Sequence, residues 1–141
     1  MVPMVMTAAD KCPDLSGRYM IQGEDGQVHI IIEQRGCGTI TIARKTGYLG
    51  TVTSERHDLR LDGVLQRDTG WFGGSDKQVT SARFVPGGLE IVARPASAGK
   101  RTELFWKELY ELLPNGDLSI RDFDKRTQSY DSGIVAHREG R

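Results

Sequence analysis

The stretch CPDLSGRYMIQGEDGQVHIIIEQRGCG, residues 12–38, decides the fold. Every second residue from Leu15 to Ile21 is Leu, Gly, Tyr or Ile, and polar or flexible residues fill the positions between them, which predicts a strand with one buried face. Asp25 and Gly26 accept the positive φ angles of a tight turn, and apolar alternation resumes over residues 28–32. We therefore expect a β-hairpin that turns at residues 23–26.

The two cysteines of the chain, Cys12 and Cys37, flank this hairpin. The turn returns both positions to the same end of the sheet, where a disulfide fits. A bond closing a loop of about 25 residues stabilises a fold by roughly 3–4 kcal/mol, and it persists in oxidising compartments. We expect a Cys12–Cys37 disulfide and an exported protein in the periplasm, in the secreted fraction or at the outer surface. The alternative is two unpaired buried thiols in a cytosolic protein.

Strand-like alternation continues along the chain, over residues 39–44, 51–54, 59–65, 78–85, 89–95, 118–123 and 132–138. Residues 101–113 are ambiguous because Leu104, Phe105, Leu109 and Leu112 also fit a helix face. We favour a strand there, since the even positions alternate and a Pro-Asn-Gly-Asp turn follows at residues 114–117.

Eight to ten short strands and no predicted helix are typical of an all-β sandwich or barrel. Short glycine-containing connections allow neighbours in sequence to pair in space, which favours an antiparallel meander β-barrel of lipocalin-like type. We expect residues 1–11 to be a flexible leader lacking a native signal peptide, and residues 12–141 to form a single β-barrel domain.

Composition narrows the function classes. Nineteen Lys plus Arg balance nineteen Asp plus Glu in the 141 residues, so no basic excess favours nucleic acid. No window reaches the roughly 18 apolar residues of a membrane-spanning helix. We expect the protein to be a monomer. We also expect it to have no nucleic-acid partner and no membrane-spanning segment.

The segment Leu15-Ser16-Gly17-Arg18-Tyr19 resembles the Gly-x-Trp opening of lipocalins and the similar first strand of avidin-like barrels. Tyr19 stands where those families have Trp, and no counterpart of the C-terminal lipocalin helix is evident. The whole chain also resembles small exported proteins of Gram-negative bacteria, some of which are surface antigens. The resemblance implies an eight-stranded barrel with a small-molecule cavity or a filled interior.

No constellation of catalytic residues stands out. His29, His57 and His137 lie on separate predicted segments without metal-ligand spacing, and the Ser-x-x-Lys match at residues 97–100 falls in a loop. The carboxylates of residues 122–131 lack the glycine and the terminal glutamate of a calcium loop. We therefore predict a protein that is not an enzyme, with no cofactor and no metal site.

Five aromatic residues are candidates for ligand binding: Tyr19, Trp71, Phe72, Trp106 and Tyr110. Each also has a simpler interpretation as a residue that fills the core. We predict a module that binds a small apolar or aromatic molecule. The alternative is a scaffold-type envelope protein with a filled barrel, which meets a protein partner through loops at residues 70–75 and 95–100.

Overall fold

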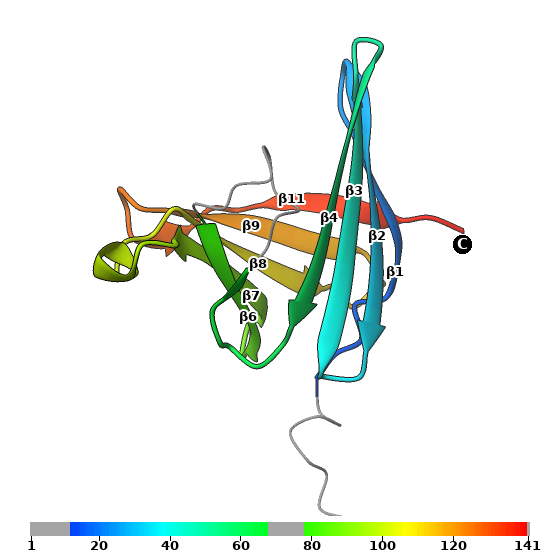
Figure 1. Ribbon diagram of the computed structural model, residues 1–141. Coiled ribbons are helices and arrows are strands. Elements are labelled where there is room, and N and C mark those ends of the chain that lie inside the picture. The colour runs from blue at the N-terminus through cyan, green and yellow to red at the C-terminus, as the bar shows by residue number, and fades with distance from the viewer. Residues whose placement is uncertain (1–11, 68–77, 141) are drawn as a thin grey trace, which may run out of the picture.

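The computed structural model describes residues 12–67 and 78–140, which fold as one antiparallel sheet of eleven strands (Figure 1). Within these two ranges there is no α-helix, and the single helical turn is the 3-10 helix η2 (Ala98–Lys100). No helix of the described residues is long and apolar enough to cross a membrane. The prediction of an all-β fold is confirmed.

The strands follow the chain around a nearly closed barrel. Their bounds are β1 (Gly17–Gln22), β2 (Gly26–Arg35), β3 (Thr39–Tyr48), β4 (Thr51–Arg60), β5 (Gln66–Arg67), β6 (Gln78–Val85), β7 (Gly88–Pro95), β8 (Trp106–Leu112), β9 (Leu118–Asp124), β10 (Ser129–Tyr130) and β11 (Ile134–Arg138). Their order is β4-β3-β2-β1-β11-β9-β8-β7-β6-β5, with β10 beside β9. The first strand, β1, therefore pairs with the last, β11. β4 and β5 stand at the two ends of the strand order.

Two short strands raise the number above the predicted eight to ten. β5 and β10 have two residues each. β10 and β11 both pair with β9, and the register shifts by one residue between them, at a bend where Gly133 has φ +77°. Together they form one bulged strand along β9.

The ambiguous segment is a strand, as predicted, because β8 runs from Trp106 to Leu112. β4 differs from expectation, because residues 51–60 form one continuous strand instead of two pieces. Its inward positions include Glu55 and His57, so apolar alternation is missing over the first part of the strand.

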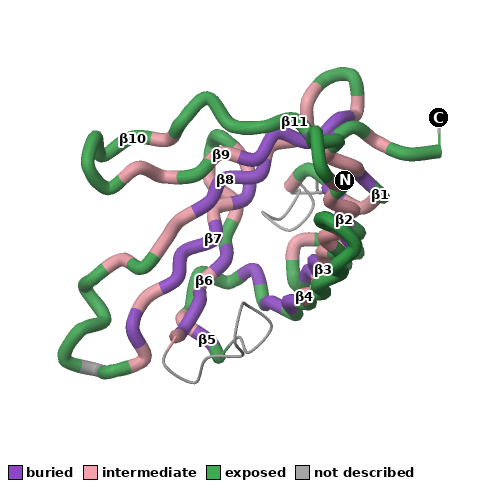
Figure 2. The backbone as a smooth tube through the Cα atoms, turned by 90° about the horizontal axis from the view of Figure 1, so that it is seen from above, coloured by how far each residue is buried: buried purple, intermediate pink, exposed green. Residues whose placement is uncertain are grey.

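The barrel interior holds the apolar core. Cross-strand partners lie on the same face of a sheet, so the pairs Tyr19–Ile30, Ile32–Ile42 and Ile40–Leu59 align their buried side chains inward. Figure 2 shows the buried segments on the strands that surround the centre. The remaining fully buried core residues are Leu15, Ala82, Leu89, Ile91, Tyr110, Leu118 and Ala136.

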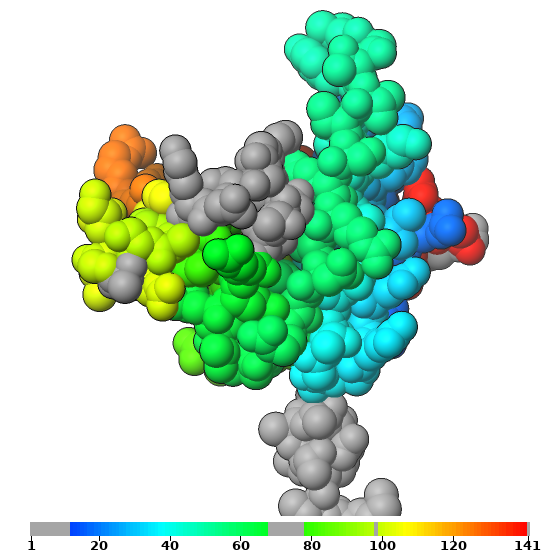
Figure 3. All heavy atoms as spheres, in the orientation of Figure 1, coloured from blue at the N-terminus to red at the C-terminus, as the bar shows by residue number. Residues whose placement is uncertain are grey.

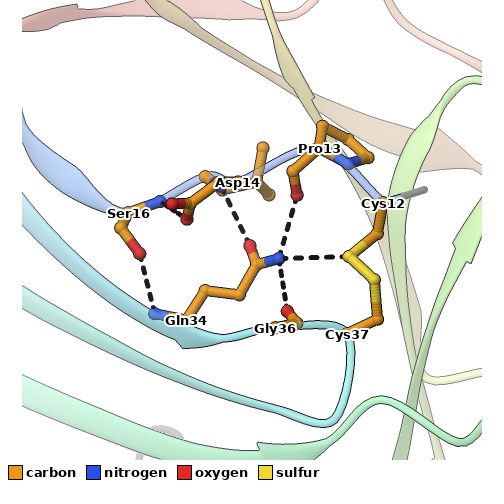
Figure 4. The surroundings of a disulfide bond; sticks show 8 residues. Cys12, Pro13, Asp14, Ser16, Gln34, Gly36 and Cys37 are labelled. Carbon is orange, nitrogen blue, oxygen red and sulfur yellow. Dashed lines mark hydrogen bonds between the residues drawn. A yellow bond between two sulfur atoms is a disulfide. The ribbon is translucent and has the colours of Figure 1, made fainter. Parts of the chain in front are cut away.

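The predicted disulfide is present between Cys12 and Cys37, with Cα atoms 5.9 Å apart (Figure 4). The Gln34 side chain lies beside it and donates to the carbonyl oxygens of Pro13 and Gly36 at 2.9 and 2.8 Å. Its Oε1 accepts from the Leu15 amide at 2.9 Å. The disulfide and Gln34 together fasten the segment before β1 to the end of β2.

The β3–β4 hairpin projects beyond the rest of the molecule (Figure 3). Its turn places Leu49 and Gly50 at φ +47° and +82°, which are the signs of a type I′ turn. Tyr48, Leu49 and Val52 are 55%, 71% and 59% exposed at this tip. The long hairpin therefore presents apolar side chains away from the core.

Candidate functional site

One part of the inner wall combines a hydroxyl, a small side chain and an indole. Thr80 on β6, Ala93 on β7 and Trp106 on β8 are successive cross-strand partners, so they share one face. Trp106 packs against the apolar core, which places this row inside the barrel. Ala93, the middle residue of the row, has the smallest of the three side chains and is fully buried.

The Thr80 side chain is fully buried, and its Oγ1 has no hydrogen-bond partner. Gln78, two residues earlier on the same face of β6, also has a buried Nε2 without a partner. A buried polar group left unsatisfied costs about 1–3 kcal/mol, and such groups are rare in folded proteins. Two of them on adjacent inward positions indicate a place where an additional hydrogen-bonding group belongs.

A charged cluster crosses the interior beside this row. Arg44 on β3 donates to the Tyr110 hydroxyl and lies 3.4 Å from the Glu108 carboxylate, both on β8. Tyr110 in turn donates to Glu108 Oε1 at 3.2 Å. These three side chains link opposite walls of the barrel.

Burial governs the protonation of this cluster. It raises the pKa of the Glu108 carboxyl above its ordinary value, although the nearby Arg44 lowers it. Burial also raises the pKa of Tyr110, and the Glu108 carboxylate adds to that effect. Burial alone lowers the pKa of Arg44, but the oxygens of Tyr110 and Glu108 raise it overall. The Tyr110 phenol is therefore neutral at physiological pH, and Arg44 is cationic.

A second polar pair extends the cluster along β4. His57 is completely buried, and its Nε2 lies 3.3 Å from Glu55 Oε2. Glu55 is the direct cross-strand partner of Arg44, so the two polar groups are contiguous. One end of the interior is thus polar, whereas the end around Leu15, Ile40 and Leu59 is apolar.

The predicted ligand-binding residues fall into three groups. Trp106 and Tyr110 lie on β8 within the site just described. Tyr19 is buried in the same interior, but its hydroxyl donates to Leu15 and accepts from Arg138, at 2.7 and 2.9 Å. Trp71 and Phe72 lie outside the described residues. A ligand role for each of the five stays a prediction.

Sequence reasoning missed the polar members of the site, namely Arg44, Glu55, His57, Thr80 and Glu108. A usable signal was present, because Arg44 continues the inward phase of Ile40 and Ile42, and Glu108 lies in phase with Trp106 and Tyr110. A charged residue at an inward position of a strand marks a buried charge.

The described residues hold no group of three or more His, Cys, Asp or Glu side chains that could bind a metal ion. The histidines are dispersed: His57 is interior, His29 lies near Glu139, and His137 lies 3.0 Å from Asp117. The donors and acceptors of the polar end can form hydrogen bonds with a ligand.

The chain matches no protein-family model, no curated protein sequence and no solved structure. The likeness of its first strand to lipocalins and avidin-like proteins therefore stays a prediction from residues 15–19. The case for a function depends on the geometry of the interior.

Proposed function

We propose that this protein is a non-catalytic binding module that holds a small molecule with an apolar or aromatic body inside the barrel. The unpartnered, fully buried Thr80 hydroxyl, in the same inward row as Trp106, is the observation that carries the proposal. A ligand that stacks on the indole and hydrogen-bonds Thr80 would satisfy a group that the protein leaves unsatisfied. Binding sites of this kind combine apolar walls with a few placed polar groups.

The charged cluster supports a ligand whose polar group is uncharged. Arg44 already lies 3.4 Å from the Glu108 carboxylate, and the His57 ring lies 3.3 Å from Glu55. A hydroxyl, carbonyl or amide group fits this balanced surrounding, whereas an added charge would be buried without a counter-ion.

An exported location is part of the proposal. The Cys12–Cys37 disulfide supports it, since such bonds persist in oxidising compartments. Two free sulfhydryls in the protein purified from its own host under native conditions would remove this support.

The test uses the neutral aromatic dye N-phenyl-1-naphthylamine, with binding followed by dye fluorescence. Thr80→Val removes the hydroxyl but keeps the side-chain shape, so we expect an equal or greater free energy of unfolding together with weaker dye binding. Trp106→Leu is expected to abolish energy transfer from this indole and to weaken binding further. The matched control is Thr53→Val at an exposed position of β4, which should bind as the wild type does.

Native mass spectrometry of protein from its own host provides the second measurement. A co-purified mass that is present in the wild type and reduced in Thr80→Val supports the proposal. Equal dye affinity in the wild type, Thr80→Val and Trp106→Leu would contradict it.

An interaction role is the second candidate, and the β3–β4 tip favours it. Tyr48, Leu49 and Val52 expose apolar side chains on a projecting hairpin, as contact residues of an envelope or surface protein do. A scaffold of this kind would bind a protein partner through its loops and would carry no small molecule. Failure of both ligand tests would leave this role as the better account.

A further inference from the structure

The outer face of the β1–β4 wall carries a hollow that the interior site does not explain. Its volume is about 510 Å³, and it lies over all four strands. Because cross-strand partners share a face, the register gives its layout. One row across the wall consists of Arg18, Ile31, Ala43 and Arg56. The adjacent row contains His29, Lys45 and Ser54.

The floor of the hollow is apolar, and its two ends are cationic. Ile31 is 37% exposed, and the neighbouring Ala43 is too small to fill the space beside it. Arg18 and Arg56 stand at opposite ends of this row, three strand spacings or roughly 14 Å apart at the backbone. The volume lies within the range of small-molecule sites.

The cations of the hollow are only partly neutralised. His29 lies 3.1 Å from Glu139, and Arg56 lies 3.3 Å from Asp58. Across residues 12–67 and 78–140, neither Arg18 nor Lys45 forms an ion pair. The whole chain has a net charge of zero, so this positive surface is a local feature.

We propose that this hollow, lined by Arg18, Ile31, Ala43, Lys45 and Arg56, is a second binding site, and that it takes an elongated organic anion. The apolar body of the ligand lies on Ile31 and Ala43. Carboxylate, sulfate or phosphate groups at its ends pair with Arg18 and Arg56, because a guanidinium binds such groups through two parallel hydrogen bonds. The site is independent of the interior site and of its neutral ligand.

The probe is a naphthalenedicarboxylate with carboxylates at opposite ends of the ring system, titrated by calorimetry. We expect Arg18→Ala/Arg56→Ala to weaken binding about tenfold or more, because two charge-assisted contacts are lost. Ala43→Leu fills the floor without changing charge and should weaken binding as well. The control Arg83→Ala/Arg101→Ala removes the same charge from exposed positions elsewhere and should bind as the wild type does.

Two further measurements locate the site and separate it from other surfaces. Amide chemical-shift changes should centre on Ile31 and Ala43, and the uncharged naphthalenedimethanol should bind much more weakly. Equal binding of the charged and uncharged probes, or equal loss in the Arg83/Arg101 control, would overturn the proposal. It would also be overturned if the two arginines bound phosphatidylglycerol vesicles but no soluble dicarboxylate.

The two proposed sites can fail separately. Ala43→Leu should leave binding of N-phenyl-1-naphthylamine inside the barrel unchanged, because Ala43 faces outward. Thr80→Val should leave naphthalenedicarboxylate binding unchanged, because Thr80 faces the interior and does not line the outer hollow. A variant that alters both titrations equally would contradict the independence of the sites.

Discussion

The Tyr19 side chain links the segment before β1 to β11, the last strand of the chain. It is fully buried, its hydroxyl donates to the Leu15 carbonyl, and Arg138 donates to it from β11. The Arg138 guanidinium also lies over the Tyr19 ring at 5.0 Å. A Cβ at Gly17 would lie 2.6 Å from Arg138 Nη1, so a larger residue there would displace this guanidinium.

Removal of the Tyr19 hydroxyl should therefore destabilise the protein. Tyr19→Phe leaves the buried Leu15 carbonyl and the Arg138 guanidinium each without one partner, and we expect a loss of about 1–3 kcal/mol in the free energy of unfolding. Urea denaturation measures the loss. Tyr48→Phe, at an exposed tyrosine, is the control and should change stability little. Equal effects of the two substitutions would count against the role of the buried hydroxyl.

Glu108 should make stability depend on pH in a defined direction. Burial raises the pKa of its carboxyl above 4.5 in the folded protein. Its contribution to stability is therefore complete below pH 4.5 and is lost as the pH rises through the raised pKa. Glu108→Gln lacks this titration, so the stability of the wild type relative to this variant should fall over that window.

Urea denaturation of the wild type and Glu108→Gln at a series of pH values tests this sign. Glu111→Gln, on the outward face of the same strand, controls for the loss of one carboxylate. A stability difference that grows with pH would mean that Arg44 outweighs burial and lowers the pKa of Glu108 below its ordinary value.

At the scale of elements, the β1–β2 hairpin is held by covalent and polar links at its open end. The Cys12–Cys37 bond closes a loop with a sequence separation of 25, and Gln34 adds hydrogen bonds to Pro13, Leu15 and Gly36. Cys12→Ser/Cys37→Ser should lower the free energy of unfolding by about 3–4 kcal/mol, because the unfolded chain gains freedom. Chemical denaturation with and without reductant gives the value.

Mass spectrometry provides the accompanying check on the bond. The wild-type protein should weigh about two daltons less than its reduced form, since each disulfide removes two hydrogens. If reductant leaves the stability of the folded wild type unchanged, the bond makes no contribution to the hairpin.

At the scale of the whole molecule, the barrel wall has a seam between β4 and β5, which do not pair with each other as strands. β4 and β5 are at opposite ends of the strand order. The Gln66 side chain bridges the seam by accepting from the Arg60 amide at 2.9 Å and donating to the Arg60 carbonyl at 3.0 Å. Its backbone meanwhile pairs with Thr80 on β6. The Gln66 side chain thus connects β4 to β5, where the two strands do not pair through their backbones.

Loss of this bridge should open the seam. Gln66→Met keeps a similar shape but removes both hydrogen bonds, so we expect about 1–3 kcal/mol lower stability and faster hydrogen exchange at the Arg60 amide. Gln27→Met, at an exposed glutamine of β2, should leave both unchanged. Unaltered exchange at Arg60 would show that the seam is closed by other contacts.

The alternation of residues 15–32 and the turn at residues 23–26 fixed the first hairpin, and the cysteines at its two ends implied the disulfide. The hairpin and its disulfide depend on residues close in sequence and on a single turn, so a local pattern is enough to predict them. The strand from Trp106 to Leu112 was also predictable, because alternation and the following turn outweighed helix propensity.

The polar end of the interior was decided only by tertiary structure. Arg44 meets Glu108 and Tyr110 across sequence separations of 64 and 66, and no local pattern specifies which strands face each other across a barrel. The same holds for the unpartnered Thr80 and for the outer hollow, which require the register of several strands. Periodicity determines which face a side chain takes, whereas closure of the barrel determines what that side chain meets.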